Sequence, residues 1–83
     1  MVSSTCYAQG GITASGQQAR PGEVANNVLP LGTHIILDHP AFGRQEYVIL
    51  DRIGSGSELD IFNESESACN AYGRQERGFS VLR

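Results

Sequence analysis

The chain has 83 residues and a formal charge of −3, from six arginines and nine carboxylates, with no lysine. This length limits it to one domain, residues 1–83. The charge balance argues against a nucleic-acid partner, which requires a clustered basic face. No apolar run approaches the roughly 18 residues of a transmembrane helix, so membrane insertion is not expected. Ten glycines and three prolines predict an all-β fold with short strands and many turns.

The strand-like segments follow one another with short turns between them. We expect strands or extended pieces at 3–9, 12–16, 23–25, 33–38, 45–51, 58–62 and 78–82, with a loop at 39–44. After residue 62 the hydrophobic period changes. Asn63 at the N-cap and Glu66 three residues later form a capping signature, which predicts a helix of about ten residues that ends at Gly73. The sequence therefore predicts a small barrel, mainly β, with one short helix.

One aspartate is embedded in each of two neighbouring strand-like runs, at Asp51 and Asp60. Aspartate is a poor strand former, so each needs a reason, and a functional site is the leading one. A two-residue turn at Ser55-Gly56 would place Asp51 directly opposite Asp60. Their Cβ atoms would then lie about 4.5–5.5 Å apart, and the two charges would repel. We expect such a pair to have one raised pKa, as acid/base sites require.

The two cysteines, Cys6 and Cys69, have neither a metal-binding nor a Cys-x-x-Cys spacing. One alternative is a disulfide that joins the first strand to the helix. The other is a pair of reduced thiols buried in the core. The N-terminus has no secretory-signal pattern, and for this reason the sequence favours free thiols over the disulfide.

Five motifs in order carry a resemblance that spans Tyr7 to Leu82. They are Gly11-Ile12-Thr13-Ala14-Ser15-Gly16, Pro30-Leu31-Gly32-Thr33, Asp51-Arg52-Ile53-Gly54, Leu59-Asp60-Ile61-Phe62, and Ala68 followed by Tyr72-Gly73-Arg74 and a terminal Val81-Leu82. This order resembles the three-aspartate domain of cell-wall lytic enzymes and the related rare lipoprotein A and barwin-like domains. The resemblance implies a six-stranded double-psi β-barrel.

The resemblance also implies an activity, the cleavage of peptidoglycan glycan strands by lytic transglycosylation, which leaves 1,6-anhydro sugar ends without added water. Asp60 matches the family's catalytic acid/base, and Asp51 matches a second aspartate that would raise the pKa of Asp60 or bind sugar hydroxyls. No cofactor is implied. Two positions depart from the pattern. Ile53 precedes the glycine of the Asp-Arg-Gly turn, and Asn26 stands where the family has an aspartate or a histidine. Asparagine cannot exchange a proton near neutral pH.

Substrate contacts are expected from the residues around these carboxylates. Thr13 and Ser15 would hydrogen-bond sugar hydroxyls from the Thr-Ala-Ser-Gly turn, and Asn26 would do so through its amide. Arg52 would neutralise Asp51 or hold a substrate carboxyl. Each aspartate has a structural alternative as a strand-end acceptor of backbone N–H groups. The Asp38-His39 pair offers too few ligands for a metal, so no metal site is expected.

The rival prediction is a barrel without catalysis. Such a domain would bind peptidoglycan or another glycan, or serve in an assembly such as a phage particle. A barwin-like domain that recognises a protein partner is a third alternative. The expected location is the cell envelope or the extracellular space, with the export signal absent from this chain, or a virion. The substitution at Asn26 favours the non-catalytic alternative, whereas retention of Asp51 and Asp60 favours the enzyme.

Overall fold

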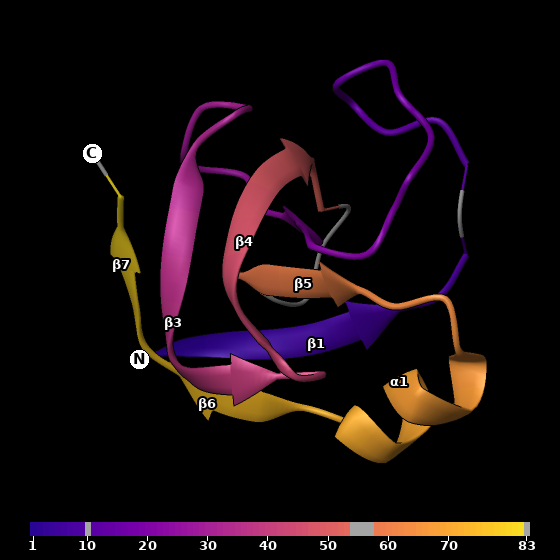
Figure 1. The fold of residues 1–83 in the computed structure, drawn as a ribbon, viewed down its shortest axis with the longest axis vertical. Helices are drawn as coiled ribbons and strands as arrows, with labels where there is room; N and C mark the ends of the chain where they lie inside the picture. The colour runs from indigo at the N-terminus through magenta and orange to yellow at the C-terminus, as the bar shows by residue number, and fades with distance from the viewer. Residues whose placement is uncertain (10, 54–57, 83) are drawn as a thin grey trace.

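A computed structural model describes residues 1–9, 11–53 and 58–82 (Figure 1). These residues form seven strands and one helix. In chain order they are β1 Val2–Tyr7, β2 Glu23–Ala25, β3 His34–Ala41, β4 Arg44–Asp51, β5 Leu59–Phe62, α1 Glu66–Tyr72, β6 Gln75–Arg77 and β7 Phe79–Val81. The fold is thus mainly β with one short helix, as predicted. No helix in the described ranges has the length and apolar character needed to cross a membrane.

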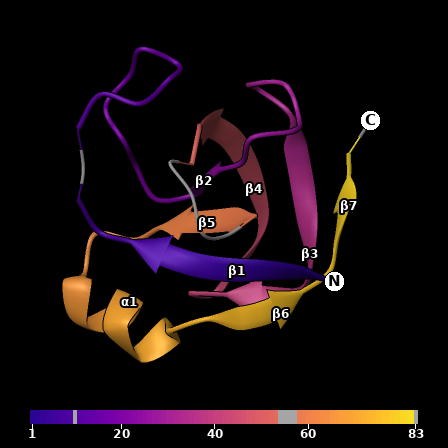
Figure 2. The ribbon, with the colours of Figure 1, turned by 180° about the vertical axis from the view of Figure 1, so that it is seen from behind.

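All seven strands belong to one sheet, in the order β6-β1-β5-β2-β4-β3-β7. Its two edge strands, β6 and β7, are consecutive in the chain and separated only by Gly78. The segment 75–81 therefore leaves β1 and joins β3, which nearly closes the sheet into a barrel (Figures 1 and 2). The predicted count of six strands was wrong. β6 was missed, because its sequence, Gln75-Glu76-Arg77, is polar and carries no strand signal. The extended piece expected at 12–16 forms only an isolated bridge between Ile12 and Gln18.

The predicted pairing of β4 with β5 was also wrong. Strand β2 lies between them, parallel to β4 and antiparallel to β5. Asp51 and Asp60 therefore do not face each other; each lies opposite Ala25. With β4 on one side and β5 on the other, the backbone N–H and C=O groups of β2 can pair along both of its edges, which a fully buried strand requires. The turn expected at Ser55-Gly56, and Gly54 of the third motif, fall outside the described residues.

Strand β1, like β2, lies between two strands that follow each other along the chain. β1 lies between β5, to which it is parallel, and β6, to which it is antiparallel. The connection from β5 to β6 contains α1 and crosses the end of β1 (Figure 2). The barrel thus contains two such arrangements: β2 separates β4 from β5, and β1 separates β5 from β6.

The loop expected at 39–44 is instead a tight hairpin between β3 and β4. Phe42 and Gly43 form its two-residue turn, with φ values of 53° and 72°. Positive φ at both positions suits the right-handed twist of the two strands. The turn was missed because phenylalanine is uncommon there. A register irregularity between Ile36 and Ala41 accommodates Pro40, which cannot donate to the ladder.

The interior of the barrel is aliphatic. Its fully buried side chains are those of Val24, Ile35, Leu37, Ile49, Leu59 and Ile61, with Ser4 among them. Because side chains alternate along a strand, the residues between them face outward. Leu59 and Ile61 point into the core while Asp60 points to the other face, as the sequence predicted. The outer face of β1, β5, β2 and β4 is where the polar residues gather.

Helix α1 begins later than predicted. Its N-cap is Ser65, whose hydroxyl accepts from the N–H of Ala68 at 3.1 Å. Asn63 instead accepts from the N–H of Ser65 at 2.8 Å, so the prediction of Asn63 as the cap was wrong by two residues. The helix has seven residues rather than about ten, and it ends before Gly73, as predicted. Asn63 and Ser65 are both favoured N-cap residue types and lie two positions apart, so the sequence signature alone does not decide between them.

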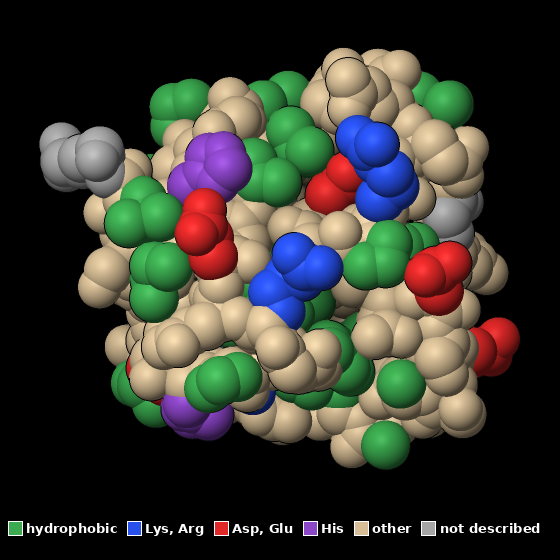
Figure 3. Space-filling view, in the orientation of Figure 1, with side chains coloured by type: hydrophobic (Ala, Val, Ile, Leu, Met, Phe, Trp, Pro, Cys, Tyr) green, Lys and Arg blue, Asp and Glu red, His purple; other side chains and the backbone are tan. Residues whose placement is uncertain are grey.

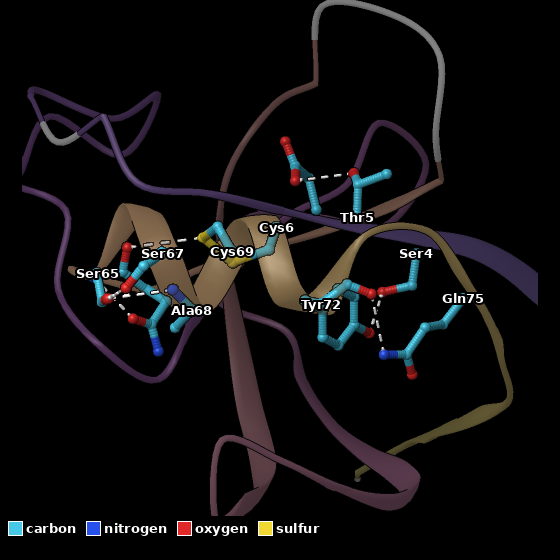
Figure 4. Close-up of a disulfide and its surroundings, with 11 residues drawn as sticks. Ser4, Thr5, Cys6, Ser65, Ser67, Ala68, Cys69, Tyr72 and Gln75 are labelled. Carbon is cyan, nitrogen blue, oxygen red and sulfur yellow. Dashed lines mark hydrogen bonds between the residues drawn. A yellow bond between two sulfur atoms is a disulfide. The ribbon is translucent and has the colours of Figure 1, made fainter.

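A disulfide joins Cys6 of β1 to Cys69 of α1, with the two Cα atoms 5.0 Å apart (Figure 4). The preference for free thiols was therefore wrong. The bond closes a loop of 63 residues, which corresponds to about 4 kcal/mol of stabilisation in the loop-entropy model. Figure 4 also shows the alternation of β1: Ser4 and Cys6 point toward the helix, and Thr5 points away from it.

Candidate functional site

A cavity of about 350 Å³ opens on the outer face of the sheet, where β1, β2, β4 and β5 come together. Both predicted carboxylates line it. Its lining residues are Tyr7, Ala8, Gln9, Ala25, Asp51, Arg52, Ile53 and Asp60. We refer to this cavity as the cleft. On the face shown in Figure 3, acidic and basic side chains are interspersed among apolar ones.

The register places Asp51 and Asp60 on one face with Ala25 between them. Directly opposed residues of neighbouring strands share a face, so all three side chains point into the cleft. Two strand spacings separate β4 from β5, about 10 Å between backbones, rather than the single spacing that a hairpin would give. The small methyl group of Ala25 leaves open space between the two carboxylates. A ligand group can enter there.

Asp60 is half-buried, and its Oδ1 accepts a hydrogen bond from the Thr5 hydroxyl at 2.9 Å. Burial raises the pKa of Asp60, the Thr5 hydrogen bond opposes this, and the charge of Asp51 adds a smaller increase. Repulsion was expected to be the main cause, but desolvation is larger because the two carboxylates are not adjacent. A carboxyl in this setting retains its proton to higher pH than an ordinary aspartic acid. It is suited to proton donation.

Asp51 has a different environment. Its Oδ1 accepts from the backbone N–H groups of Ala14, at 2.9 Å, and Arg52, at 2.8 Å. The bond to Ala14 fixes the loop 11–20 against the end of β4, and the N–H of Ser15 adds a bond to Leu50 O at 3.1 Å. Asp51 therefore accepts hydrogen bonds from backbone N–H groups at the end of its strand, which is the structural alternative expected from the sequence. Its carboxylate lines the cleft at the same time.

Thr13 and Ser15 lie in the loop that Asp51 holds, but neither lines the cleft. The Thr13 side chain is buried; its Oγ1 lies 2.7 Å from the Ser15 hydroxyl oxygen and donates to Gln17 O at 3.1 Å. The two hydroxyls thus bond within the loop itself. Their expected contact with a sugar stays a prediction, and the geometry gives both residues a role in shaping the loop.

Asn26 points away from the cleft. Its amide nitrogen donates to Glu58 O at 2.8 Å, and its Oδ1 accepts from the N–H groups of Val28 and Leu29, each at 2.8 Å. It lines a separate, mostly apolar cavity of about 400 Å³. Because the buried amide already bonds on both sides, Asn26 shapes the turn that follows β2.

Arg52 lines the cleft, yet its guanidinium is directed at the same turn. Its Nη1 donates to Asn26 O and Leu29 O, both at 2.7 Å. It makes no ion pair with Asp51 within the described part of the chain. Arg52 therefore braces the segment 26–29 from the rim of the cleft. Asp51 accepts its hydrogen bonds from backbone N–H groups and not from the Arg52 guanidinium.

Sequence reasoning missed Tyr7. Its ring packs edge-on against Phe62, with centroids 5.3 Å apart, and its hydroxyl is buried without a hydrogen-bond partner among the described residues. Burial raises the pKa of Tyr7, and the charges of Asp51, Asp60 and Glu23 raise it further, so the phenol stays protonated. The only signal in the sequence is that Tyr7 lies two residues after Thr5. That signal has meaning only once β1 is known to pair with β5.

The Asp38-His39 pair, considered for a metal, belongs to a different cluster. Asp38 accepts from the N–H of Gly78 at 3.0 Å, and its Oδ1 lies 3.6 Å from the Arg77 guanidinium. His39 Nδ1 lies 3.1 Å from the same carboxylate. Within the residues that the structure describes, no three His, Cys, Asp or Glu side chains are grouped as a metal site requires.

Comparisons with family models, curated proteins and solved structures find no match for this chain. The resemblance carried by its motifs therefore remains an expectation about the family. The structure adds the surroundings of the motif residues: three of the six predicted site residues, Asp51, Arg52 and Asp60, share one cleft. The other three lie outside it.

Proposed function

We propose that this domain is a double-psi β-barrel that cleaves the glycan strands of peptidoglycan by lytic transglycosylation. The arrangement of β2 between β4 and β5, and of β1 between β5 and β6, supports the fold assignment, because each resembles the Greek letter psi when drawn flat. β7 would then be an addition to the six strands of that barrel. The observation that carries the function is the half-buried Asp60 carboxyl with its raised pKa in a cleft shared with a second carboxylate.

The chemistry requires one group that first gives and then takes a proton. Protonated Asp60 would donate its proton to the glycosidic oxygen as the bond from that oxygen to C1 breaks. The resulting carboxylate would accept the proton of the C6 hydroxyl of the same sugar, whose oxygen bonds to C1. The ring closes to the 1,6-anhydro product, no water is consumed, and Asp60 is protonated again. The Asp51 carboxylate, which accepts hydrogen bonds from two backbone N–H groups, would stabilise positive charge that develops at C1.

A second candidate function is glycan binding or assembly without catalysis. The observation that favours it is Asn26: the side chain at the position of a family acid is committed to backbone groups and faces away from the cleft. Asp51 in its anchoring role would be retained by such a domain as well. The disulfide supports an oxidising location, such as the cell envelope, the extracellular space or a virion, for either candidate.

The deciding experiment is digestion of purified peptidoglycan, with mass spectrometry of the released fragments. We expect the native protein to release anhydro-muropeptides and Asp60→Asn to release none, because asparagine cannot donate the proton. Asp38→Asn is the matched control: it removes a carboxylate remote from the cleft and should leave the product yield unchanged. If the native protein releases nothing but still pellets with peptidoglycan, the binding function is correct and the catalytic one is wrong.

A further inference from the structure

Among the residues that the structure describes, the Tyr7 hydroxyl is buried without a hydrogen-bond partner, whereas almost all other buried side-chain polar atoms have one. Within the described ranges, only Tyr7 Oη and Glu23 Oε1 are buried side-chain oxygen or nitrogen atoms without a hydrogen bond. Buried polar groups without partners are rare, because each loses its bond to water and gains nothing in return. Phenylalanine would fill the same space against Phe62 without that cost. The hydroxyl therefore calls for a functional explanation.

The sheet register places Tyr7 next to Asp60 on one face of the sheet. β1 and β5 are parallel, with Thr5 opposite Asp60 and Tyr7 opposite Phe62. Tyr7 is thus the diagonal neighbour of Asp60 on the same face, a distance that an aromatic side chain spans. Both residues line the cleft. The titratable and charged groups that line the cleft with Asp60 are Tyr7 from β1, Asp51 at the end of β4 and Arg52 directly after it. The charge of Glu23, from β2, acts on Tyr7.

We propose that Tyr7 is a positioning residue that donates a hydrogen bond to the Asp60 carboxylate after Asp60 has given up its proton. The inference rests on the proposed function. When Asp60 protonates the leaving oxygen, a negative charge appears at a half-buried site where Thr5 donates one hydrogen bond. A small rotation of the Asp60 carboxylate or of the Tyr7 side chain, which brings their oxygen atoms to hydrogen-bond distance, would supply another. The phenol keeps its own proton throughout, so Asp60 alone exchanges protons with the substrate.

The phenol is suited to this task because it does not ionise in the working range. Burial and the surrounding carboxylates hold the pKa of Tyr7 above its ordinary value. A hydrogen bond to a charged acceptor is stronger than one to a neutral acceptor. The bond would therefore form mainly when Asp60 is ionised. Because it stabilises the ionised form, it would make the pKa of Asp60 lower than it would be without the Tyr7 hydroxyl.

The test compares Tyr7→Phe with the matched variant Tyr47→Phe. Tyr47 is a buried tyrosine whose hydroxyl donates to Ala41 O at 2.6 Å, away from the cleft. We expect Tyr7→Phe to keep or raise the melting temperature, because no bond is lost, and Tyr47→Phe to lower it. Carboxyl-carbon NMR titration should show an increased Asp60 pKa in Tyr7→Phe only. The release of anhydro-muropeptides by Tyr7→Phe should fall about ten- to a hundredfold.

The titration distinguishes failure of this inference from failure of the proposed function, because it requires no substrate. An unchanged Asp60 pKa in Tyr7→Phe, or a shift confined to Asp51, overturns the role assigned to Tyr7. If the Asp60 pKa rises but the native protein releases no anhydro-muropeptides, the contact between Tyr7 and Asp60 is correct and the glycan-cleaving function is wrong.

Discussion

Two polar clusters of this barrel differ in how completely their groups are bonded. The first, which we call the closing corner, consists of Ser4, Asp38, Tyr72 and Arg77, where the ends of the sheet meet. Arg77 is buried; its Nε donates to the Tyr72 hydroxyl at 2.9 Å and its Nη1 to His39 O at 2.7 Å. The Tyr72 hydroxyl also lies 2.8 Å from Ser4 Oγ. Each polar side chain of the closing corner has a partner.

The cleft is bonded less completely. The Tyr7 hydroxyl has no partner among the described residues, and burial raises the pKa of Asp60. In the closing corner the N–H of Gly78, together with that of His39, lowers the pKa of Asp38, and the charges of His39 and Arg77 add to this. A cluster that holds the barrel together satisfies its own polar groups. A cluster that binds or reacts leaves groups for its ligand, so the comparison favours the cleft as the candidate functional cluster.

The largest effect on folding should come from Arg77→Leu. The substitution removes the cation that bonds Tyr72 and the His39 carbonyl, and it leaves their buried acceptors without a donor. We expect the free energy of unfolding to fall by about 3 kcal/mol or more. Urea denaturation measures this loss. Arg44→Leu, at an exposed position, is the control and should change stability by about 0.5 kcal/mol at most. Equal losses in the two variants would show that the closing corner does not hold the fold.

A smaller loss is expected from Tyr72→Phe. The ring remains, 5.4 Å from that of Phe42, but Ser4 Oγ and Arg77 Nε each lose a partner in the core. We expect a cost of about 1–3 kcal/mol, measured by thermal or urea unfolding. Tyr7→Phe makes the same chemical change in the cleft and should cost nothing. If removal of either hydroxyl destabilises the protein equally, the distinction between a bonded and an unbonded cluster is wrong.

The local features of this fold could be predicted from the sequence. Alternation placed Leu59 and Ile61 in the core and Asp60 on the outer face, and Gly73 marked the end of the helix. The order of strands could not be predicted, because it depends on pairings between residues far apart in the chain. The insertion of β2 between β4 and β5 is such a pairing. Because β2 is inserted there, two strand spacings separate Asp51 from Asp60, and not the single spacing that the sequence predicted.

The candidate site, like the fold, was predictable only where its signals are local in the sequence. Asp51 and Asp60 could be named because an aspartate inside an apolar strand is locally anomalous. The orientation of Asn26 was not predictable, since the bonds that turn it from the cleft come from Glu58 and from the bend after β2. Tyr7 carried no anomaly at all, because a tyrosine in a strand is ordinary. It became notable only when its hydroxyl was seen to be unpaired in three dimensions.

The smallest expected effect is the pH dependence of stability, in which the two clusters should have opposite signs. The raised pKa of Asp60 means that the folded state binds this proton more tightly than the unfolded state does. Its contribution is full at low pH and is lost as the pH rises through the folded pKa. The lowered pKa of Asp38 gives a contribution that is present above the ordinary pKa and lost as the pH falls through the folded one.

Replacement of each carboxyl by an amide removes its titration. At neutral pH we therefore expect Asp60→Asn to raise the urea midpoint relative to the native protein and Asp38→Asn to lower it. At about pH 3, where ordinary carboxyls are mostly protonated, the differences in urea midpoint between each variant and the native protein should shrink. A midpoint that falls at neutral pH in Asp60→Asn would mean that this carboxylate is stabilised in the folded protein, as structural carboxylates are. Burial of Asp60 would then be no sign of function, and the cleft would resemble the closing corner.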